Sequence, residues 1–166
     1  MSSLRGVVYT VRLFLAGVPP YKEAFIKHPP LYVLQSFIYA QDWQMQEYKK
    51  GRYKLFLLDS GAFTFMAKAK KTGAAADFDK YLDEYIAFIN KWDVKLFFEL
   101  DIDDIVGYET VKRMRKKLEQ KTGKKCVPVW HKSRGIEEYK RLCQEYDYIA
   151  IGGLALKDIK RRNTQR

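Results

Sequence analysis

The chain has little cysteine and no long hydrophobic run, and each shortage argues against a class of protein. Only Cys126 and Cys143 occur among its 166 residues, without the paired spacing of a zinc site. We expect two buried free thiols in a reducing cytoplasm rather than a disulfide scaffold. No apolar run reaches the roughly 18–20 residues of a membrane span, and residues 1–17 lack the long apolar region and cleavage site of a signal peptide. We therefore expect a cytoplasmic protein without membrane contact.

Several local catalytic signatures are missing as well. The chain has no G-x-x-x-x-G-K-[ST] or G-x-G-x-x-G loop, no H-E-x-x-H helix and no G-x-S-x-G turn. These absences argue against P-loop, Rossmann, zincin and α/β-hydrolase proteins. A Ser-His-Asp triad that uses Ser60 and His131 stays open, although nothing local supports it.

What the chain does have is apolar content and positive charge. Apolar residues make up 47% and aromatic residues 15%, which indicates a globular protein. The length predicts a single domain over residues 1–156. The net charge is +11, of which residues 157–166 carry +4 as a basic tail. A basic surface favours a polyanion such as nucleic acid, and a solvated lysine surface is the equal alternative.

Short β-type runs alternate with helical segments along the chain. This alternation predicts parallel strands joined by right-handed crossovers, and several runs are apolar on both faces. The β-type runs are 11–16, 31–37, 53–59, 94–101, 126–131 and 148–152, and the helices are expected at 21–27, 41–50, 77–92, 109–121 and 136–146. Asp77 or Asp79 is expected to cap the third helix, and Gly123 to end the fourth. An open doubly wound sheet and a (β/α)₈ barrel both fit, but a full barrel needs about 250 residues, so a barrel with about six strands would be incomplete.

Ligands of both architectures bind at the carboxyl ends of the strands. In this chain the residues at those positions are unusually polar, and carboxylates there are costly to desolvate unless they are used or paired. We therefore predict a site among these residues: Gly17, Ser36, Tyr39, Asp59, Ser60, Gly61, Phe63, Glu99, Asp101, Asp103, Asp104, Trp130, His131, Lys132, Arg134, Gly152 and Gly153.

Each of these residues also has a simpler structural interpretation. Asp59 is a candidate for a turn in which it accepts backbone N–H bonds. The run Asp101-Ile102-Asp103-Asp104 suits either a helix cap or a divalent-metal site. His131 is either an ordinary rim histidine or a partner of Asp101 or Glu99. The pair Gly152-Gly153 permits close approach of an anion or a flat ring, and also suits a tight turn. Aromatic side chains such as Phe63 stack on a base or pack in the core.

Two short motifs suggest a family. The sequence Asp59-Ser60-Gly61-Ala62-Phe63 resembles the D-S-G-G-F element of tRNA-guanine transglycosylases, and residues 149–155 resemble their G-G-L-A element. Between them, residues 98–101 are similar to the family's strand that ends in a base-recognising Asp, and residues 127–131 to a strand that adds a polar side chain. The match covers about Leu55 to Leu156 and is more similar to the shorter phage and prophage relatives.

The resemblance implies a parallel (β/α) barrel of TIM type, here incomplete, that binds guanine or a 7-deazaguanine belonging to tRNA or DNA. It implies no cofactor and no metal in this part of the chain. Asp59 would be the catalytic acid/base or a base-contacting group, and Asp101 would read the base edge. The substrate-binding residues would be Ser60, Gly61, Phe63, Glu99, Asp101, His131, Gly152, Gly153 and Leu154.

In the family, a nucleophilic Asp and a structural zinc site lie beyond the G-G-L-A element. Here only residues 156–166 follow, and their one carboxylate, Asp158, comes too early. We therefore expect a base-binding domain that is inactive alone, with an unpaired strand edge that a second copy or a complementing chain covers. Two alternatives remain, a non-catalytic nucleic-acid-binding protein and a metal-dependent hydrolase that uses Glu99, Asp101, Asp103 and His131.

Overall fold

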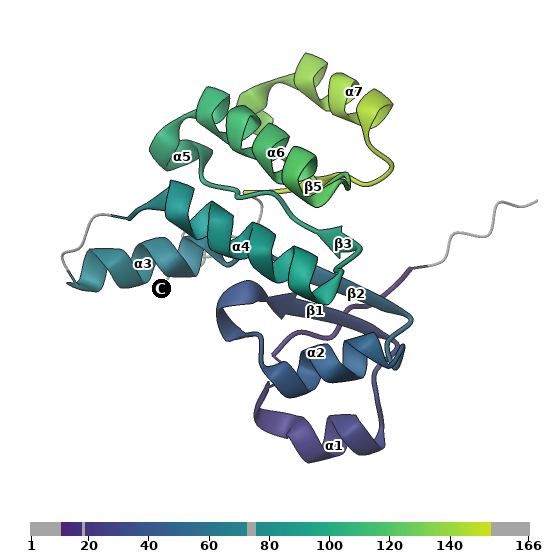
Figure 1. Ribbon diagram of the computed structural model, residues 1–166. Coiled ribbons are helices and arrows are strands. Elements are labelled where there is room, and N and C mark those ends of the chain that lie inside the picture. Colours follow the sequence, from purple (N-terminus) through teal and green to yellow (C-terminus); the bar gives the residue numbers. More distant parts are fainter. Residues whose placement is uncertain (1–10, 18, 73–75, 154–166) are drawn as a thin grey trace, which may run out of the picture.

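The computed structural model describes residues 11–17, 19–72 and 76–153 of the protein (Figure 1). The strands are β1 (Tyr32–Ser36), β2 (Leu55–Asp59), β3 (Leu96–Phe97), β4 (Val129–Trp130) and β5 (Ala150–Ile151). The helices are α1 (Lys22–Lys27), α2 (Asp42–Lys49), α3 (Ala62–Thr72), α4 (Phe78–Trp92), α5 (Asp103–Val106), α6 (Tyr108–Thr122) and α7 (Ile136–Glu145). Three 3-10 turns, η1 (Pro19–Tyr21), η2 (Phe37–Tyr39) and η3 (Lys132–Arg134), connect them.

The strands form two small parallel sheets whose order follows the chain. In the first sheet β1 pairs with β2, from Tyr32 opposite Leu55 to Ser36 opposite Asp59, and β2 pairs with β3. In the second sheet β4 pairs with β5. Because all these strands are parallel, their carboxyl ends lie at the same edge, where the sequence predicts the site.

The predicted TIM-type barrel is wrong. The described residues hold five short strands in sheets of three and two, and these strands do not close into a barrel. The ladder breaks after one isolated bridge between Phe98 and Val127. At the next position Val129 donates its N–H to the side chain of Glu99 at 2.7 Å instead of to a backbone carbonyl, so β3 and β4 separate.

The ends of the chain also differ from the prediction. The run 11–16 is not a strand: only Leu15 bridges to Val33, at the edge of β1. The run 148–152 contributes only the two residues of β5. The helices α3 and α5 are absent from the sequence prediction, whereas the other five agree with it closely. Asp77 caps α4 by accepting the N–H of Lys80, and Gly123 ends α6 in the left-handed conformation, as predicted.

The sheet has one face covered by helices and one face that is half open. Side chains of one parity (Val33, Phe56, Leu58 and Phe97) are buried in a core with α4 and α6 residues Leu82, Tyr85, Ile89 and Leu118. Figure 1 shows α2, α4 and α6 together on this side. Side chains of the other parity, such as Leu34 and Leu57, are only half-buried. The apolar pattern predicted burial on both faces, and only one face has it.

A buried amide pair ties α2 to the sheet. Gln44 of α2 donates from Nε2 to Gln35 Oε1 of β1 at 2.6 Å, and both side chains are buried. Gln44 Oε1 also accepts the N–H of Gln41 at 3.0 Å, which completes a capping box at the start of α2. These bonds satisfy buried polar groups, and they fix the segment between β1 and α2 that borders the site.

Two further expectations concern cysteine and membranes. Both cysteines are free, as predicted, but only Cys126 is buried and Cys143 is exposed on α7. Among the described residues, no helix has the length and apolar character to cross a membrane.

The two faces of β2 predict unequal costs of truncation. Leu58→Ala removes a fully buried side chain and is expected to lower the free energy of unfolding by about 2–5 kcal/mol. Leu57→Ala, on the half-open face of the same strand, is expected to cost about 1 kcal/mol. Urea denaturation of both variants measures the difference, and equal costs would show that both faces are covered.

Candidate functional site

A cavity of about 660 Å³ opens at the carboxyl ends of β1 and β2. Its wall combines apolar side chains with a few polar ones, which is typical of small-molecule sites. The lining residues are Ala16, Gly17, Pro20, Leu34, Gln35, Ser36, Ile38, Tyr39, Ala40, Gln41 and Asp59. Gly17, Ser36, Tyr39 and Asp59 belong to the predicted strand-end set, whereas Gln35 and Gln41 do not.

Asp59 supplies the carboxylate in this wall. It is the last residue of β2, and its Oδ2 accepts the N–H of Gly61 at 3.1 Å. Burial raises the pKa of Asp59 above its ordinary value, and the negative charge of Asp101 adds to the rise. The Gly61 N–H opposes the shift without cancelling it. No arginine or lysine neutralises this carboxylate within the described part of the chain.

The turn after Asp59 requires glycine. Gly61 has a φ of +67°, and a Cβ there would lie 2.7 Å from Ser36 Oγ and 3.1 Å from Ile38 Cγ1. Ser60 is buried, and its carbonyl accepts the hydroxyl of Tyr81 from α4 at 2.5 Å. The Asp-Ser-Gly sequence therefore brings β2 against the turn after β1 and aims Asp59 at the cavity.

A second group of polar residues surrounds Asp101, after β3. His131 Nε2 lies 2.9 Å from Asp101 Oδ2, and Arg134 Nη2 lies 3.3 Å from Asp101 Oδ1. Both carboxylate oxygens are thus held by residues of the segment after β4, while the side chain remains one-third exposed. The predicted pairing of His131 with Asp101 is present, and the charge of Asp101 reaches Asp59.

The imidazole of His131 lies against Gly152. A Cβ at position 152 would come within 2.3 Å of His131 Nε2 and 2.7 Å of Val129 Cγ1. Gly152 is therefore needed for the position of His131. Gly153 has a φ of +74° and lies beside the same ring. The structure thus places a histidine, contributed by the chain itself, where the glycine pair was expected to meet a flat ligand.

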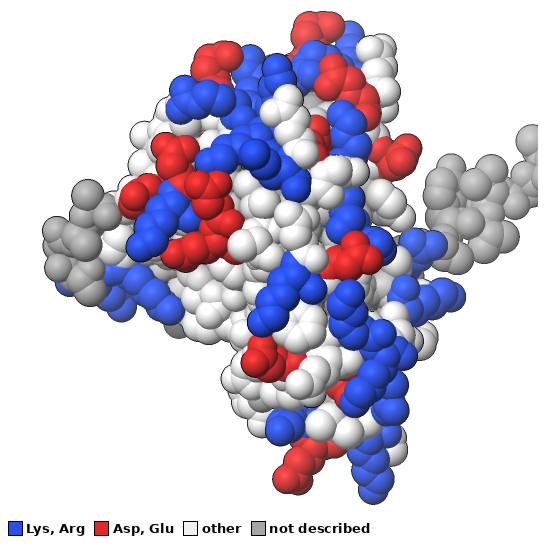
Figure 2. All heavy atoms as spheres, viewed as in Figure 1, with Lys and Arg blue, Asp and Glu red and all other residues white. Residues whose placement is uncertain are grey.

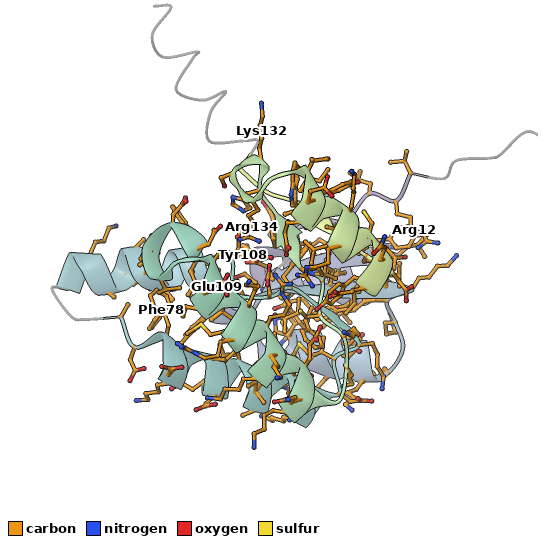
Figure 3. All side chains as sticks on the ribbon, turned by 90° about the horizontal axis from the view of Figure 1, so that it is seen from above. Arg12, Phe78, Tyr108, Glu109, Lys132 and Arg134 are labelled. Carbon is orange, nitrogen blue, oxygen red and sulfur yellow. The ribbon has the colours of Figure 1, made fainter. Side chains whose placement is uncertain are left out.

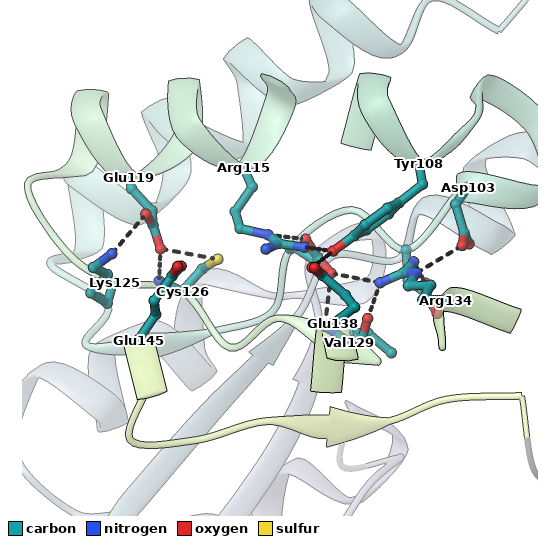
Figure 4. Close-up of polar contacts among 12 residues, drawn as sticks. Asp103, Tyr108, Arg115, Glu119, Lys125, Cys126, Val129, Arg134, Glu138 and Glu145 are labelled. Atoms are coloured by element: carbon teal, nitrogen blue, oxygen red, sulfur yellow. Dashed lines mark hydrogen bonds and ion pairs between the residues drawn. The ribbon is translucent and has the colours of Figure 1, made fainter. Parts of the chain in front are cut away.

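Glu99 forms a buried ionic network with Arg115 and Arg134. Figure 4 shows these two arginines with Tyr108 and Val129. Glu99 is 1% exposed, and Arg115 Nε lies 2.6 Å from its Oε2. Its Oε1 accepts the Val129 N–H at 2.7 Å and lies 3.4 Å from Arg134 Nη1. Burial raises the pKa of Glu99, and the two guanidinium groups and the Val129 N–H oppose that rise. Glu99 thus has protein partners on both oxygens.

Tyr108 extends the network to α6 and α7. The guanidinium of Arg134 lies 4.3 Å from the centre of its ring, a cation–π contact. Its hydroxyl donates to Glu138 and accepts from Arg115 Nη2. Figure 3 shows Tyr108 and Arg134 close together inside the molecule, with Lys132 pointing away from it.

Asp101 and two neighbouring residues have the spacing of a cation site. Asp101, Asp103 and His131 each offer one ligand atom, and these atoms lie within 4.8 Å of one another. Arg134 already contacts both carboxylates, with its Nε 2.9 Å from Asp103 Oδ2. Burial opposes ionisation of Asp103, but Arg134 outweighs it and lowers the pKa of Asp103. A metal ion would have to compete with this guanidinium for its ligands.

Phe63 and Leu154 complete the predicted set. Phe63 is 64% exposed near the start of α3, and Leu154 lies outside the described residues.

The structure brings two groups to one edge, the cavity with Asp59 and the cluster with Asp101, Asp103 and His131. Arg134 belongs to the predicted strand-end residues, but its role as the common partner of that cluster was not predicted.

Comparisons with known proteins add no relative. No protein-family model matches the chain, and no curated protein or solved structure is significantly similar to it. The resemblance to transglycosylases therefore stays a prediction that depends on the motifs themselves.

The turn after Asp59 predicts a contrast between two glycines in the same backbone conformation. Gly51→Ala places a Cβ at φ +70° in open space and is expected to cost about 1 kcal/mol of unfolding free energy. Gly61→Ala adds a steric overlap with Ser36 Oγ and is expected to cost about 2–5 kcal/mol in total. Urea denaturation compares them. Equal losses would mean that the close contact at Gly61 is not present in solution.

Proposed function

We propose that the protein binds a guanine-type purine base in the cavity beside Asp59. The observation that carries the proposal is the unneutralised carboxylate of Asp59 in the wall of a cavity of about 660 Å³. Cavities of roughly 300–1,000 Å³ are typical of small-molecule sites. The D-S-G-A-F resemblance independently suggests the same class of ligand for the same residue.

The hydrogen-bonding chemistry fits guanine better than adenine. Guanine presents its N1–H and its exocyclic amino group side by side, and one carboxylate accepts both. Adenine offers an acceptor at N1, which would face a carboxylate without a proton between them. A carboxylate in the cavity wall thus selects for two adjacent donors.

The apolar part of the wall suits the faces of the ring. Leu34 and Ile38 provide aliphatic contacts, and Tyr39 is 51% exposed at the border of the cavity. Aromatic side chains in such positions stack on bases with useful affinity. Asp101 lies at the same edge but outside the cavity wall, where His131 and Arg134 hold it in one orientation, and its charge acts on Asp59.

The proposal concerns binding and assigns no nucleophile. Base exchange also requires a group that attacks the ribose, and the resemblance puts that group beyond the matched residues. The metal-dependent hydrolase is a weaker alternative, because Arg134 already occupies the carboxylates that would bind the ion. Calorimetric titration with Mg²⁺, Mn²⁺ or Zn²⁺ would reveal that alternative.

Base binding predicts a selective effect of one carboxylate. Calorimetry with guanine and 7-deazaguanine is expected to show binding that Asp59→Asn weakens by about 10–100-fold, because hydrogen bonds to a charged acceptor contribute about 1.5–3 kcal/mol. Adenine is expected to bind at least about tenfold more weakly than guanine, since it leaves the acceptor unpaired.

Asp104→Asn is the matched control, because Asp104 is an exposed carboxylate after the neighbouring strand that does not line the cavity. It is expected to bind guanine as the unmodified protein does. The proposal fails if neither guanine nor 7-deazaguanine binds. It also fails if Asp59→Asn and Asp104→Asn weaken binding equally.

A further inference from the structure

The opposite end of the sheet carries a basic surface. We call this set the amino-end surface, because its members precede β2 and β3 or end α1 and α2: Lys27, Lys49, Lys50, Arg52, Lys54 and Lys95, all exposed. Figure 2 shows Lys and Arg side chains gathered at the lower right, where α1 and α2 end, with few acidic side chains among them. These residues form no part of the cavity wall.

Backbone and side-chain contacts bring these segments together. Arg52 donates from Nη2 to the carbonyl of Ile26 at 2.7 Å, which joins the loop before β2 to the end of α1. The hydroxyl of Tyr48 in α2 accepts the N–H of Lys95 and donates to the carbonyl of Asp93, both at 3.2 Å. The six cationic residues therefore lie on segments that are in direct contact.

The positive charge of this surface is only partly compensated. Glu47 pairs with Lys50 at 2.6 Å and Arg52 at 3.5 Å, and Asp93 pairs with Lys95 at 2.5 Å. Asp93 is shared with Lys124, at 2.8 Å. Three exposed lysines form no ion pair with any carboxylate of the described residues: Lys27, Lys49 and Lys54.

The two ends of the sheet therefore differ in charge. The carboxyl ends hold four aspartates, Asp59, Asp101, Asp103 and Asp104, against two cationic residues, Lys132 and Arg134, and this acidic excess disfavours a polyanion. The amino ends attract one. Stabilisation of helix carboxyl ends by cations accounts for Lys27 and Lys49. It does not account for Arg52, Lys54 and Lys95, which precede strands.

We propose that the amino-end surface binds the phosphate backbone of a nucleic acid. Neutralising phosphates with lysine and arginine releases counterions, and this release drives binding that depends little on sequence. Membrane-surface binding is typical of an amphipathic helix with cations along one side and apolar anchors along the other. Here the cations come from the ends of separate segments. The proposal is independent of base binding at Asp59.

The test compares two sets of three neutralising substitutions in the full chain. The first set is Lys27→Gln, Lys49→Gln and Lys54→Gln. The matched control set, with the same loss of charge on exposed residues of α4 and α6, is Lys80→Gln, Arg113→Gln and Lys116→Gln. Fluorescence anisotropy with labelled single-stranded and duplex oligonucleotides measures affinity across a salt series, and a thermal melt of each variant checks folding.

Each lost phosphate contact is expected to weaken binding about eightfold at about 0.1 M salt. The first set is therefore expected to weaken binding by about 60- to 500-fold, for two to three lost contacts, and to reduce the salt slope by about 2–3, while the control set retains most of the affinity. The proposal is overturned if the two sets weaken binding equally, or if the first set leaves it unchanged. It is also overturned if phosphatidylserine vesicles bind in place of the oligonucleotides.

Discussion

The arrangement of the carboxyl-end edge depends on one buried carboxylate, Glu99. A buried charge is costly unless it is paired and hydrogen-bonded, and Glu99 meets that demand with Arg115, Arg134 and the N–H of Val129. These partners belong to α6, η3 and β4, so a single residue of the chain after β3 joins three later elements. The same bond to Val129 ends the ladder between β3 and β4. Arg134, once held by Glu99, reaches Asp101 and Asp103.

This network distinguishes Asp59 from two other aspartates of the edge. Asp101 and Asp103 lie against Arg134, whereas Asp59 lies beside the cavity without a cationic partner among the described residues. Because the folded-state pKa of Asp59 is raised, its ionised form opposes folding at neutral pH. That cost declines as the pH falls through the raised pKa and is gone below the ordinary value of 3.8. Asp103 has a lowered pKa, so it stabilises the fold above 3.8 and loses that effect in acid. A carboxylate that is kept at a cost to stability is typical of a functional site.

The sequence predicted those features that depend on local chemistry. Helix α4 has a regular apolar stripe and an Asp cap, and α6 ends at a glycine, so both were predicted closely. The parallel strands and the polar residues at their carboxyl ends follow from the alternation of segments. The barrel was wrong because strand length and closure depend on distant pairings, such as that of Glu99 with Val129, which are 30 residues apart. Helix α3 was missed because it follows β2 after only Ser60 and Gly61, without a loop to mark its start. Gln41 and Asp59 line the same cavity, and the bond between Gln35 and Gln44 that fixes the start of α2 is one that no local pattern reveals.

The central claim is that Asp59 is a carboxylate of the cavity wall without a cationic partner among the described residues, at an edge where Arg134 holds Glu99, Asp101 and Asp103. Carboxyl-detected NMR titration of the aspartates tests it directly. The account predicts that Asp59 titrates above 3.8 and Asp103 below it, and that Arg134→Gln raises the pKa of Asp103. A pKa of Asp59 at or below 3.8, or an Asp103 unaffected by Arg134→Gln, would contradict it.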